Sequence, residues 1–245
     1  MRDFKRNFPE PILRWIGSIK VKINRNPISK MTKQRPILFS TPMVQGVLED
    51  RKNETRRTRG LDRLNENPDM FEYADQIDHC GKTIFFLSHK ETRNEMVLHC
   101  PYGDAGDELW VRETWAYLSD HPMAAQFLYK ASEVATPGTT WRPSIHMPRE
   151  AARLFLKITK VRLERLHDIS ANGAISEGVD FIPHFLTGKR FFKDYTYYSK
   201  TPMSDNGGFD NPVDSFKSLW VSINGEASCQ INPWVWVIKF ERINK

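Results

Sequence analysis

The chain has 245 residues, of which 40% are hydrophobic and 12% aromatic, with a formal net charge of +6 and a pI near 9.2. This composition excludes a disordered chain, because enough apolar surface is present to bury a core. No run approaches the ~20 apolar residues of a membrane span, so we expect no membrane partner. The positive charge favours an anionic partner, nucleic acid above all.

The excess of basic residues is confined to the start of the chain. Residues 1–30 hold eight Lys or Arg residues and two acidic residues, an excess equal to the net charge of the whole chain. The rest of the chain is therefore close to neutral, and any basic surface on it must be local. We predict that residues 1–34 form a basic N-terminal extension, in which apolar residues between 12 and 19 have the spacing of a short helix. Alternatively, translation starts at Met31.

The cysteines bear on location and on metal binding. Cys80, Cys100 and Cys229 are too few for a disulfide framework, which indicates a reducing, cytoplasmic location. The pairs His79-Cys80 and His99-Cys100 contain four metal-ligating side chains, and a zinc site is the alternative hypothesis. Neighbouring residues on a strand point to opposite faces, however, and a Cys-x-x-Cys spacing is lacking. We therefore expect packing roles, with no metal and no other cofactor.

Hydrophobic periodicity and turn residues predict a mixture of strands and helices in residues 35–245. Residues 36–39 are predicted to form a strand, and a helix follows with Thr41 as its N-cap and Pro42 in its first turn. Residues 234–240 are the strongest strand, expected to close the sheet. The remaining predicted strands are 83–88, 95–99, 109–111, 126–130 and 154–166, and the remaining helices are 171–179 and 212–224. Two insertions, at about 58–99 and 180–211, interrupt this order.

The highest density of charge lies in residues 47–59, Val-Leu-Glu-Asp-Arg-Lys-Asn-Glu-Thr-Arg-Arg-Thr-Arg. A hydrophobic period does not explain it, so we expect an exposed turn after the helix. Lys52 and Thr55 would supply a base and a nucleophile, and nearby guanidiniums can hold a phosphate or a base edge. A solvated loop without function is the alternative.

A second candidate binding segment is the irregular loop from Trp141 to Arg149, which also holds Arg142 and His146. Aromatic and guanidinium groups together stack on bases and bind phosphates. A connector whose Trp141 fills the core is equally compatible with this sequence. Between Lys189 and Tyr198 basic and aromatic residues are interleaved, which predicts either a platform for single-stranded nucleic acid or aromatics that pack the insertion on the core.

Residues 47–59 resemble the ASCH family, a branch of the PUA-like superfamily. Its Gly-x-Lys-x-x-x-x-Arg pattern matches residues 50–57, with Asp50 where glycine is usual. Gly106-Asp107-Glu108-Leu109-Trp110-Val111 is similar to the family's Gly-Asp turn and barrel strand, residues 169–179 to its middle helix, and residues 234–243 to its closing strand. The resemblance covers roughly residues 35–243 and extends to a long form found in phage and prophage genomes. It implies an α+β fold, a PUA-like mixed β-barrel flanked by helices, with the two insertions and the basic extension added.

The resemblance also implies a chemistry. Small ASCH proteins include amidohydrolases that remove the acetyl group of N4-acetylcytidine with a Lys, a Thr and a Glu, which match Lys52, Thr55 and Glu177. Lys52 can activate Thr55 only if burial or neighbouring cations lower its pKa. Alternatively, a Lys52–Glu177 salt bridge keeps the ammonium charged and leaves a binding pocket without catalysis.

Three functions are therefore open: an amidohydrolase acting on an N4-acylated cytosine or cytidine, a non-catalytic reader of RNA or modified DNA, and a ribonuclease, since some ASCH proteins are reported to cut RNA. In each case we expect a cleft for a modified pyrimidine base or nucleoside between the Lys52 turn, the Gly106-Asp107 turn and the Glu177 helix. The predicted ligand-binding residues are Arg51, Arg56, Arg57, Asp107, Trp141, Arg142, His146 and Arg149.

Overall fold

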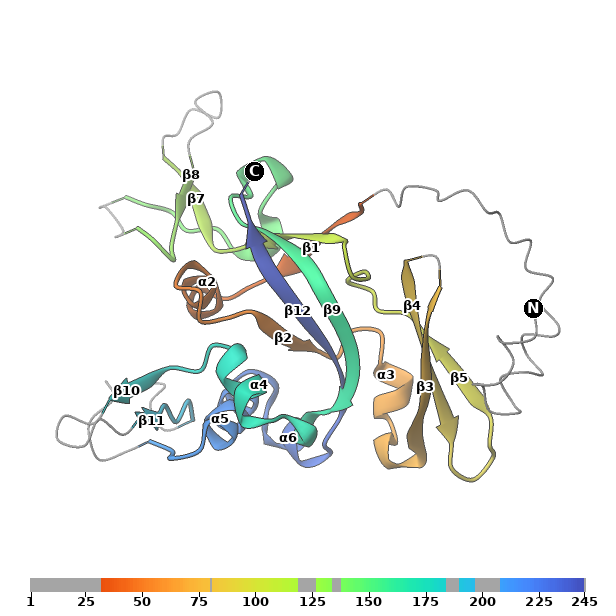
Figure 1. The fold of residues 1–245 in the computed structure, drawn as a ribbon. Helices are drawn as coiled ribbons and strands as arrows, with labels where there is room; N and C mark the ends of the chain where they lie inside the picture. The colour runs from red at the N-terminus through yellow and green to blue at the C-terminus, as the bar shows by residue number, and fades with distance from the viewer. Residues whose placement is uncertain are drawn as a thin grey trace. The chain divides into compact units, whose positions relative to one another are not determined.

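The computed structural model describes residues 32–79, 81–118, 127–133, 138–183, 190–196 and 208–244. The predicted N-terminal extension lies outside the described residues except for residues 32–34, and so does Cys80 of the alternative zinc site. The described part is a mixed α+β structure dominated by sheets (Figure 1). None of its helices is long and apolar enough to cross a membrane.

The main sheet has five strands in the order β1-β6-β9-β12-β2. They span β1 Gln34–Leu38, β2 Glu54–Arg57, β6 Glu108–Arg112, β9 Phe155–Arg165 and β12 Trp234–Ile243. β1 runs parallel to β6, and the other neighbours are antiparallel. The prediction that residues 234–240 close the sheet is wrong: β12 lies between β9 and β2. Its first five residues are all buried, because an interior strand covered on both faces needs a continuous apolar run.

The two edges of this sheet approach each other without pairing. The Arg57 guanidinium in β2 donates a hydrogen bond to the Leu38 carbonyl at the end of β1, with an Nη2–O distance of 2.9 Å. Phe39, directly after β1, packs on Phe240 of β12 with ring centroids 6.0 Å apart. The sheet is therefore curled, but the described residues form no closed barrel.

Three smaller sheets accompany the main one. They are β3 Phe71–His79 with β4 Lys82–His89 and β5 Glu95–Leu98, β7 Trp115–Tyr117 with β8 Phe127–Tyr129, and β10 Phe181–Pro183 with β11 Arg190–Phe192. The β4–β5 pair is the hairpin predicted in the first insertion. In the second insertion Phe192 is buried, and the Tyr195 hydroxyl accepts a hydrogen bond from the Asp180 amide at 2.7 Å. These two aromatics pack on the core rather than forming a platform.

The helices are short, apart from α5. They are α2 Thr41–Leu48, α3 Asp62–Asn65, α4 Ala171–Ser176, α5 Pro212–Asn224 and α6 Glu226–Gln230, with 3-10 turns η1 Pro68–Met70, η3 Ser144–His146, η4 Arg149–Ala151 and η5 Leu166–Asp168. α5 has the predicted bounds, with Asn211 capping the Val213 amide at 3.0 Å. α2 begins one residue earlier than predicted, so that Ser40 rather than Thr41 is its N-cap.

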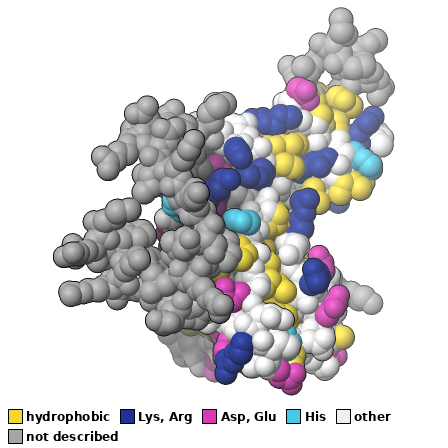
Figure 2. Space-filling view, turned by 90° about the vertical axis from the view of Figure 1, so that its right-hand side faces the viewer, with side chains coloured by type: hydrophobic (Ala, Val, Ile, Leu, Met, Phe, Trp, Pro, Cys, Tyr) yellow, Lys and Arg dark blue, Asp and Glu magenta, His cyan; other side chains and the backbone are white. Residues whose placement is uncertain are grey.

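Charge on the described surface is mixed. Figure 2 shows one face, on which Lys and Arg side chains gather over the upper part among hydrophobic ones, while Asp and Glu side chains lie mostly in the lower part. On this face the basic side chains are thus interspersed with hydrophobic and other residues.

We expect Arg153→Met to lower the free energy of unfolding by about 3 kcal/mol, because it leaves a buried carboxylate without its partner. Arg153 donates to both carboxylate oxygens of Glu113, at 2.9 and 3.0 Å, and Glu113 is only 1% exposed. Denaturant unfolding measures the change. The matched control is Arg93→Met, which removes an exposed pair with Glu72 and should cost less than about 1 kcal/mol. Equal effects of the two substitutions would contradict the expectation.

We expect Cys100 to resist alkylation where Cys229 reacts. Burial raises the pKa of the Cys100 thiol to about 12, so its reactive thiolate is scarce until the pH approaches that value. Cys229 is partly exposed. In a Cys80→Ser background at pH 8, iodoacetamide should modify Cys229 roughly 100-fold faster than Cys100. Equal rates in the native protein would refute this, whereas equal rates in denaturant are the expected control.

Candidate functional site

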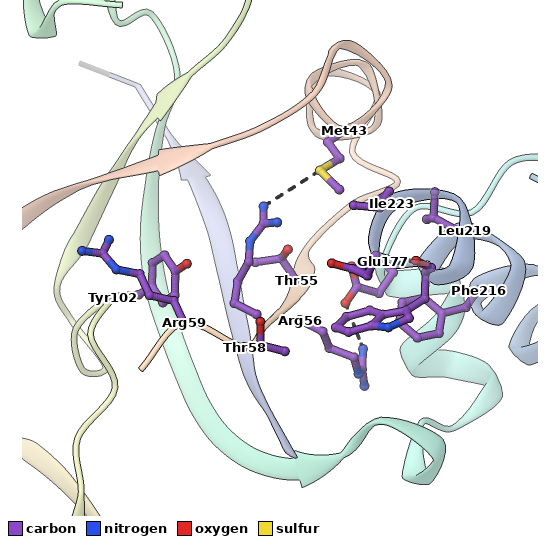
Figure 3. Close-up of a pocket in the computed structure, with 13 residues that line it drawn as sticks. Met43, Thr55, Arg56, Thr58, Arg59, Tyr102, Glu177, Phe216, Leu219 and Ile223 are labelled. Atoms are coloured by element: carbon purple, nitrogen blue, oxygen red, sulfur yellow. Dashed lines mark hydrogen bonds and ion pairs between the residues drawn. The ribbon is translucent and has the colours of Figure 1, made fainter. Parts of the chain in front are cut away.

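A cavity of about 220 Å³ lies where β2, α4 and α5 meet (Figure 3). In the close-up Tyr102 and Arg59 lie on one side, Phe216 and Leu219 on the other, and Thr55 between them. The volume is below the ~300–1,000 Å³ of pockets for drug-sized ligands, so the cavity suits a smaller group such as a single base. Its lining residues are Met43, Thr55, Arg56, Arg57, Thr58, Arg59, Tyr102, Glu177, Phe216, Leu219, Trp220, Ile223 and Asn224.

Glu177, directly after α4, reaches this cavity from beside Lys52. The Lys52 Nζ donates three hydrogen bonds: to the Glu177 carboxylate at 2.7 Å, to the Glu177 carbonyl at 2.8 Å and to the Glu54 carbonyl at 2.9 Å. Three acceptors use every N–H group of a charged ammonium. Lys52 is 3% exposed and does not line the cavity. It therefore holds Glu177 in place from behind.

Two glycines enclose the Lys52 side chain. A Cβ on Gly178, which has a φ of +85°, would lie 2.9 Å from the Lys52 Cβ, and one on Gly46 in α2 would lie 3.2 Å from it. A side chain at position 178 would therefore displace the lysine, and one at position 46 would require it to give by a few tenths of an ångström. The segment before β2 and the end of α4 are thereby packed together.

Arg56 holds the Glu177 carboxylate from the other side. Its Nη1 donates to the second Glu177 oxygen at 3.2 Å, while its Nη2 lies 3.6 Å from Glu164. Glu54, on the same face of β2, is paired with Arg162 of β9 at 3.2 Å. The Arg56 guanidinium also lies 5.5 Å from the centre of the Phe216 ring. Glu177 is therefore fixed by two cations, each of which is itself held by other groups.

The prediction of an exposed turn at residues 47–59 is wrong. Lys52, Glu54, Thr55 and Arg56 are buried, and residues 54–57 form an edge strand paired with β12. Asp50 is the exposed corner of the segment, with a φ of 56°. The charge is buried because carboxylates and guanidiniums from β9 and α4 neutralise it.

Burial lowers the pKa of the Lys52 ammonium from its ordinary value. The Glu177 carboxylate opposes this shift, and the cations of Arg57 and Arg56 add to it, so that the net direction is downward. The Thr55 hydroxyl makes no hydrogen bond with the described residues and lies in the wall that also contains Glu177. A carboxylate, a hydroxyl and a buried amine thus lie in one small region.

The structure brings together only part of the predicted site. Thr55, Arg56, Arg57 and Glu177 line the cavity, and Lys52 lies behind it. Arg51 lies beside it, donating to the Gly178 carbonyl at 3.1 Å and pairing with Asp180.

The other five predicted residues do not line the cavity. Asp107 is buried, and its carboxylate accepts a hydrogen bond from the Arg35 guanidinium at 2.9 Å. It therefore stabilises the Gly106-Asp107 turn. Arg142 stacks on Tyr117 at 4.9 Å and Arg149 on Phe155 at 4.5 Å, which fastens the loop to neighbouring strands. Within that loop Trp141 is partly buried and His146 exposed. The Gly106-Asp107 turn is not a wall of the cavity.

Sequence reasoning missed the cavity's apolar wall and its second cationic end. Phe216, Leu219, Trp220 and Ile223 come from the apolar face of α5, which the sequence predicts only as a helix. Arg59 lies in the charged segment 47–59 but is not among the predicted binding residues, and Tyr102 has no predicted role. These residues are far apart in the sequence, so a local pattern could not predict that they line the same cavity.

The described residues contain no group of three or more His, Cys, Asp or Glu side chains arranged to hold a metal. Comparison of the chain with protein-family models, with curated proteins and with solved structures found no match. The function is therefore inferred from the residues that line the cavity.

Proposed function

We propose that this chain is a nucleic-acid-directed, cytoplasmic protein of the ASCH type, within the PUA-like superfamily, and that its cavity recognises a cytosine base. The observation that carries the proposal is the Glu177 carboxylate, fixed in the cavity wall by Lys52 at 2.7 Å and Arg56 at 3.2 Å. A fixed carboxylate accepts the hydrogen bond that the exocyclic N4 amino group of cytosine donates.

The remaining walls suit the same ligand. Phe216, Trp220 and Tyr102 provide aromatic surface against which a base can stack. The Thr55 hydroxyl offers a donor for an acceptor of the ring. The ligand is a pyrimidine in RNA, in modified DNA or as a nucleoside.

Two features support the ASCH assignment. Asp50 has a φ of 56°, which is the left-handed conformation that favours the glycine usual at that position of the family pattern. Lys52 and Glu177, which match two of the family's three site residues, are in direct contact although 125 positions separate them.

Equilibrium titration with cytidine and uridine tests the proposal. Uracil presents a carbonyl oxygen where cytosine presents the amino group, so a carboxylate disfavours it. We expect cytidine to bind about five- to 100-fold tighter than uridine, and Glu177→Gln to reduce that preference, because an amide can pair with either base. Equal binding of the two nucleosides to the native protein would refute it.

Hydrolysis of an N4-acyl cytosine is the second candidate function, favoured by the Thr55 hydroxyl beside Glu177 and by the lowered pKa of Lys52. The Thr55 hydroxyl would pass its proton to the neutral Lys52 amine and attack the acyl carbon, the C–N4 bond would break with that proton delivered to the departing amine, and water would then hydrolyse the threonine ester.

Incubation with N4-acetylcytidine tests this candidate. We expect cytidine and acetate to be released, and release to stop in Thr55→Val while cytidine binding persists. The rate should rise with pH, with an apparent pKa below the ordinary 10.5 of lysine, because only a neutral amine can accept the Thr55 proton. Binding without any release would leave recognition as the sole function.

A further inference from the structure

The cavity contains cations that its carboxylates do not neutralise. Lys52 and Arg56 both pair with Glu177, and Arg162 pairs with Glu54. Arg57 and Arg59, which also line the cavity, form no ion pair with the described residues. Two guanidiniums in one small cavity therefore keep their charge available to a ligand.

Arg57 is held in position without being neutralised. It donates to the Leu38 carbonyl at 2.9 Å, contacts the Met43 sulfur at 3.9 Å (Figure 3) and lies 5.5 Å from the centre of the Phe39 ring. These contacts fix one edge of the guanidinium and leave its other nitrogens without a hydrogen-bond partner among the described residues. A preorganised, half-buried guanidinium of this kind binds an anion strongly.

Arg59 and Tyr102 extend this cationic end. The two side chains lie next to each other in the close-up, on the side of the cavity away from Phe216 (Figure 3). The cations of Arg57 and Arg59 both act on the Tyr102 hydroxyl, opposing the rise in its pKa that burial causes. The hydroxyl therefore lies within the field of both guanidiniums and can donate a further hydrogen bond to a bound oxyanion.

We propose that Arg57, Arg59 and Tyr102 form a phosphate subsite, so that the cavity takes a phosphate-bearing pyrimidine rather than a free nucleoside. The inference rests on the proposed function, with the base between Glu177 and the apolar wall of α5. The phosphate lies at the opposite end, where planar guanidiniums match its oxygens. The phosphate belongs either to a mononucleotide or to a nucleic-acid backbone.

Calorimetric titration with cytidine, CMP, UMP and a six-residue oligocytidylate tests the subsite in the full-length protein. We expect the affinity for CMP to be at least about tenfold higher than that for cytidine, because the phosphate gains charge-assisted hydrogen bonds. Arg59→Gln should remove most of this advantage. Arg59 is exposed, so this variant should fold. The matched control is Arg63→Gln, an exposed arginine of α3 that does not line the cavity and should change nothing.

The outcomes separate the subsite from base recognition. The ratio of CMP to cytidine affinity reports the subsite, and the ratio of CMP to UMP affinity reports the base. Equal binding of CMP and cytidine, no binding of any ligand, or an advantage that survives Arg59→Gln overturns the inference. Equal, Arg59-dependent binding of CMP and UMP supports the subsite and refutes cytosine recognition. Tighter, more salt-dependent binding of the oligonucleotide supports a backbone phosphate, and binding no tighter than CMP supports a mononucleotide.

Discussion

Replacing Lys52 by Met should lower the free energy of unfolding by about 3–5 kcal/mol, because removal of one partner of a buried ion pair leaves the other charge uncompensated. Lys52 and Glu177 are 3% and 5% exposed, and three hydrogen bonds of the ammonium are lost together. The Glu177 carboxylate keeps only Arg56, so cytidine binding should weaken as well. Chemical denaturation followed by tryptophan fluorescence measures the stability change.

The control for this substitution is Lys157→Met. Lys157 lies 3.9 Å from Glu241, and both side chains are about half exposed. An exposed pair contributes little, so the expected change is below about 1 kcal/mol. A loss of less than 1 kcal/mol for Lys52→Met would show that its ammonium is not the buried support of Glu177.

Gly178→Ala is expected to be strongly damaging although it adds only one methyl group. The new Cβ would lie 2.9 Å from the Lys52 Cβ, which is close to the backbone and cannot move independently of it. Overpacking costs about 1–3 kcal/mol, and the left-handed φ of +85° adds roughly 1–2 kcal/mol for any residue with a Cβ. Because Lys52 must shift, the Glu177 carboxylate shifts with it, and ligand affinity should fall together with stability.

Gly106→Ala separates the two causes. Gly106 has a similar φ of +89°, and a Cβ there would meet nothing within 4 Å. It should therefore show the backbone cost alone and leave ligand affinity unchanged. Equal losses of stability for the two variants would mean that the contact with Lys52 is relieved by small movements and does not fix the site.

Local pattern predicted the most strongly periodic elements but missed several others, among them β2, β3, β7, β10, β11, α3 and α6. The alternating or continuous apolar runs at β9, β12 and β4 and the capped amphipathic helix α5 are strong local signals, and the structure has elements at these places. The position of β12 inside the sheet was not predictable in the same way, because pairing order depends on contacts between distant segments. For the same reason, the sequence could not show that β1 and β2 remain unpaired edges of the sheet instead of closing a barrel.

Four residues that line or support the cavity were predicted from one segment, and Glu177 was predicted from the family resemblance. The sequence singled out Lys52, Thr55, Arg56 and Arg57 by their density, but density of charge was interpreted as exposure. The structure buries Lys52, Thr55 and Arg56 and half-buries Arg57, because Glu164 and Glu177 arrive from segments more than 100 positions away. The loop of Trp141 and Arg149 has a composition suited to binding, yet its guanidiniums are occupied by the protein's own aromatic rings.

A crystal structure of the protein with bound CMP would locate the base relative to Glu177. We expect the cytosine N4 within about 3 Å of a Glu177 carboxylate oxygen, the ring beside Phe216 and Trp220, and the phosphate against Arg57 and Arg59. A cytosine bound outside this cavity, or one whose N4 faces a group other than the Glu177 carboxylate, would contradict this expectation.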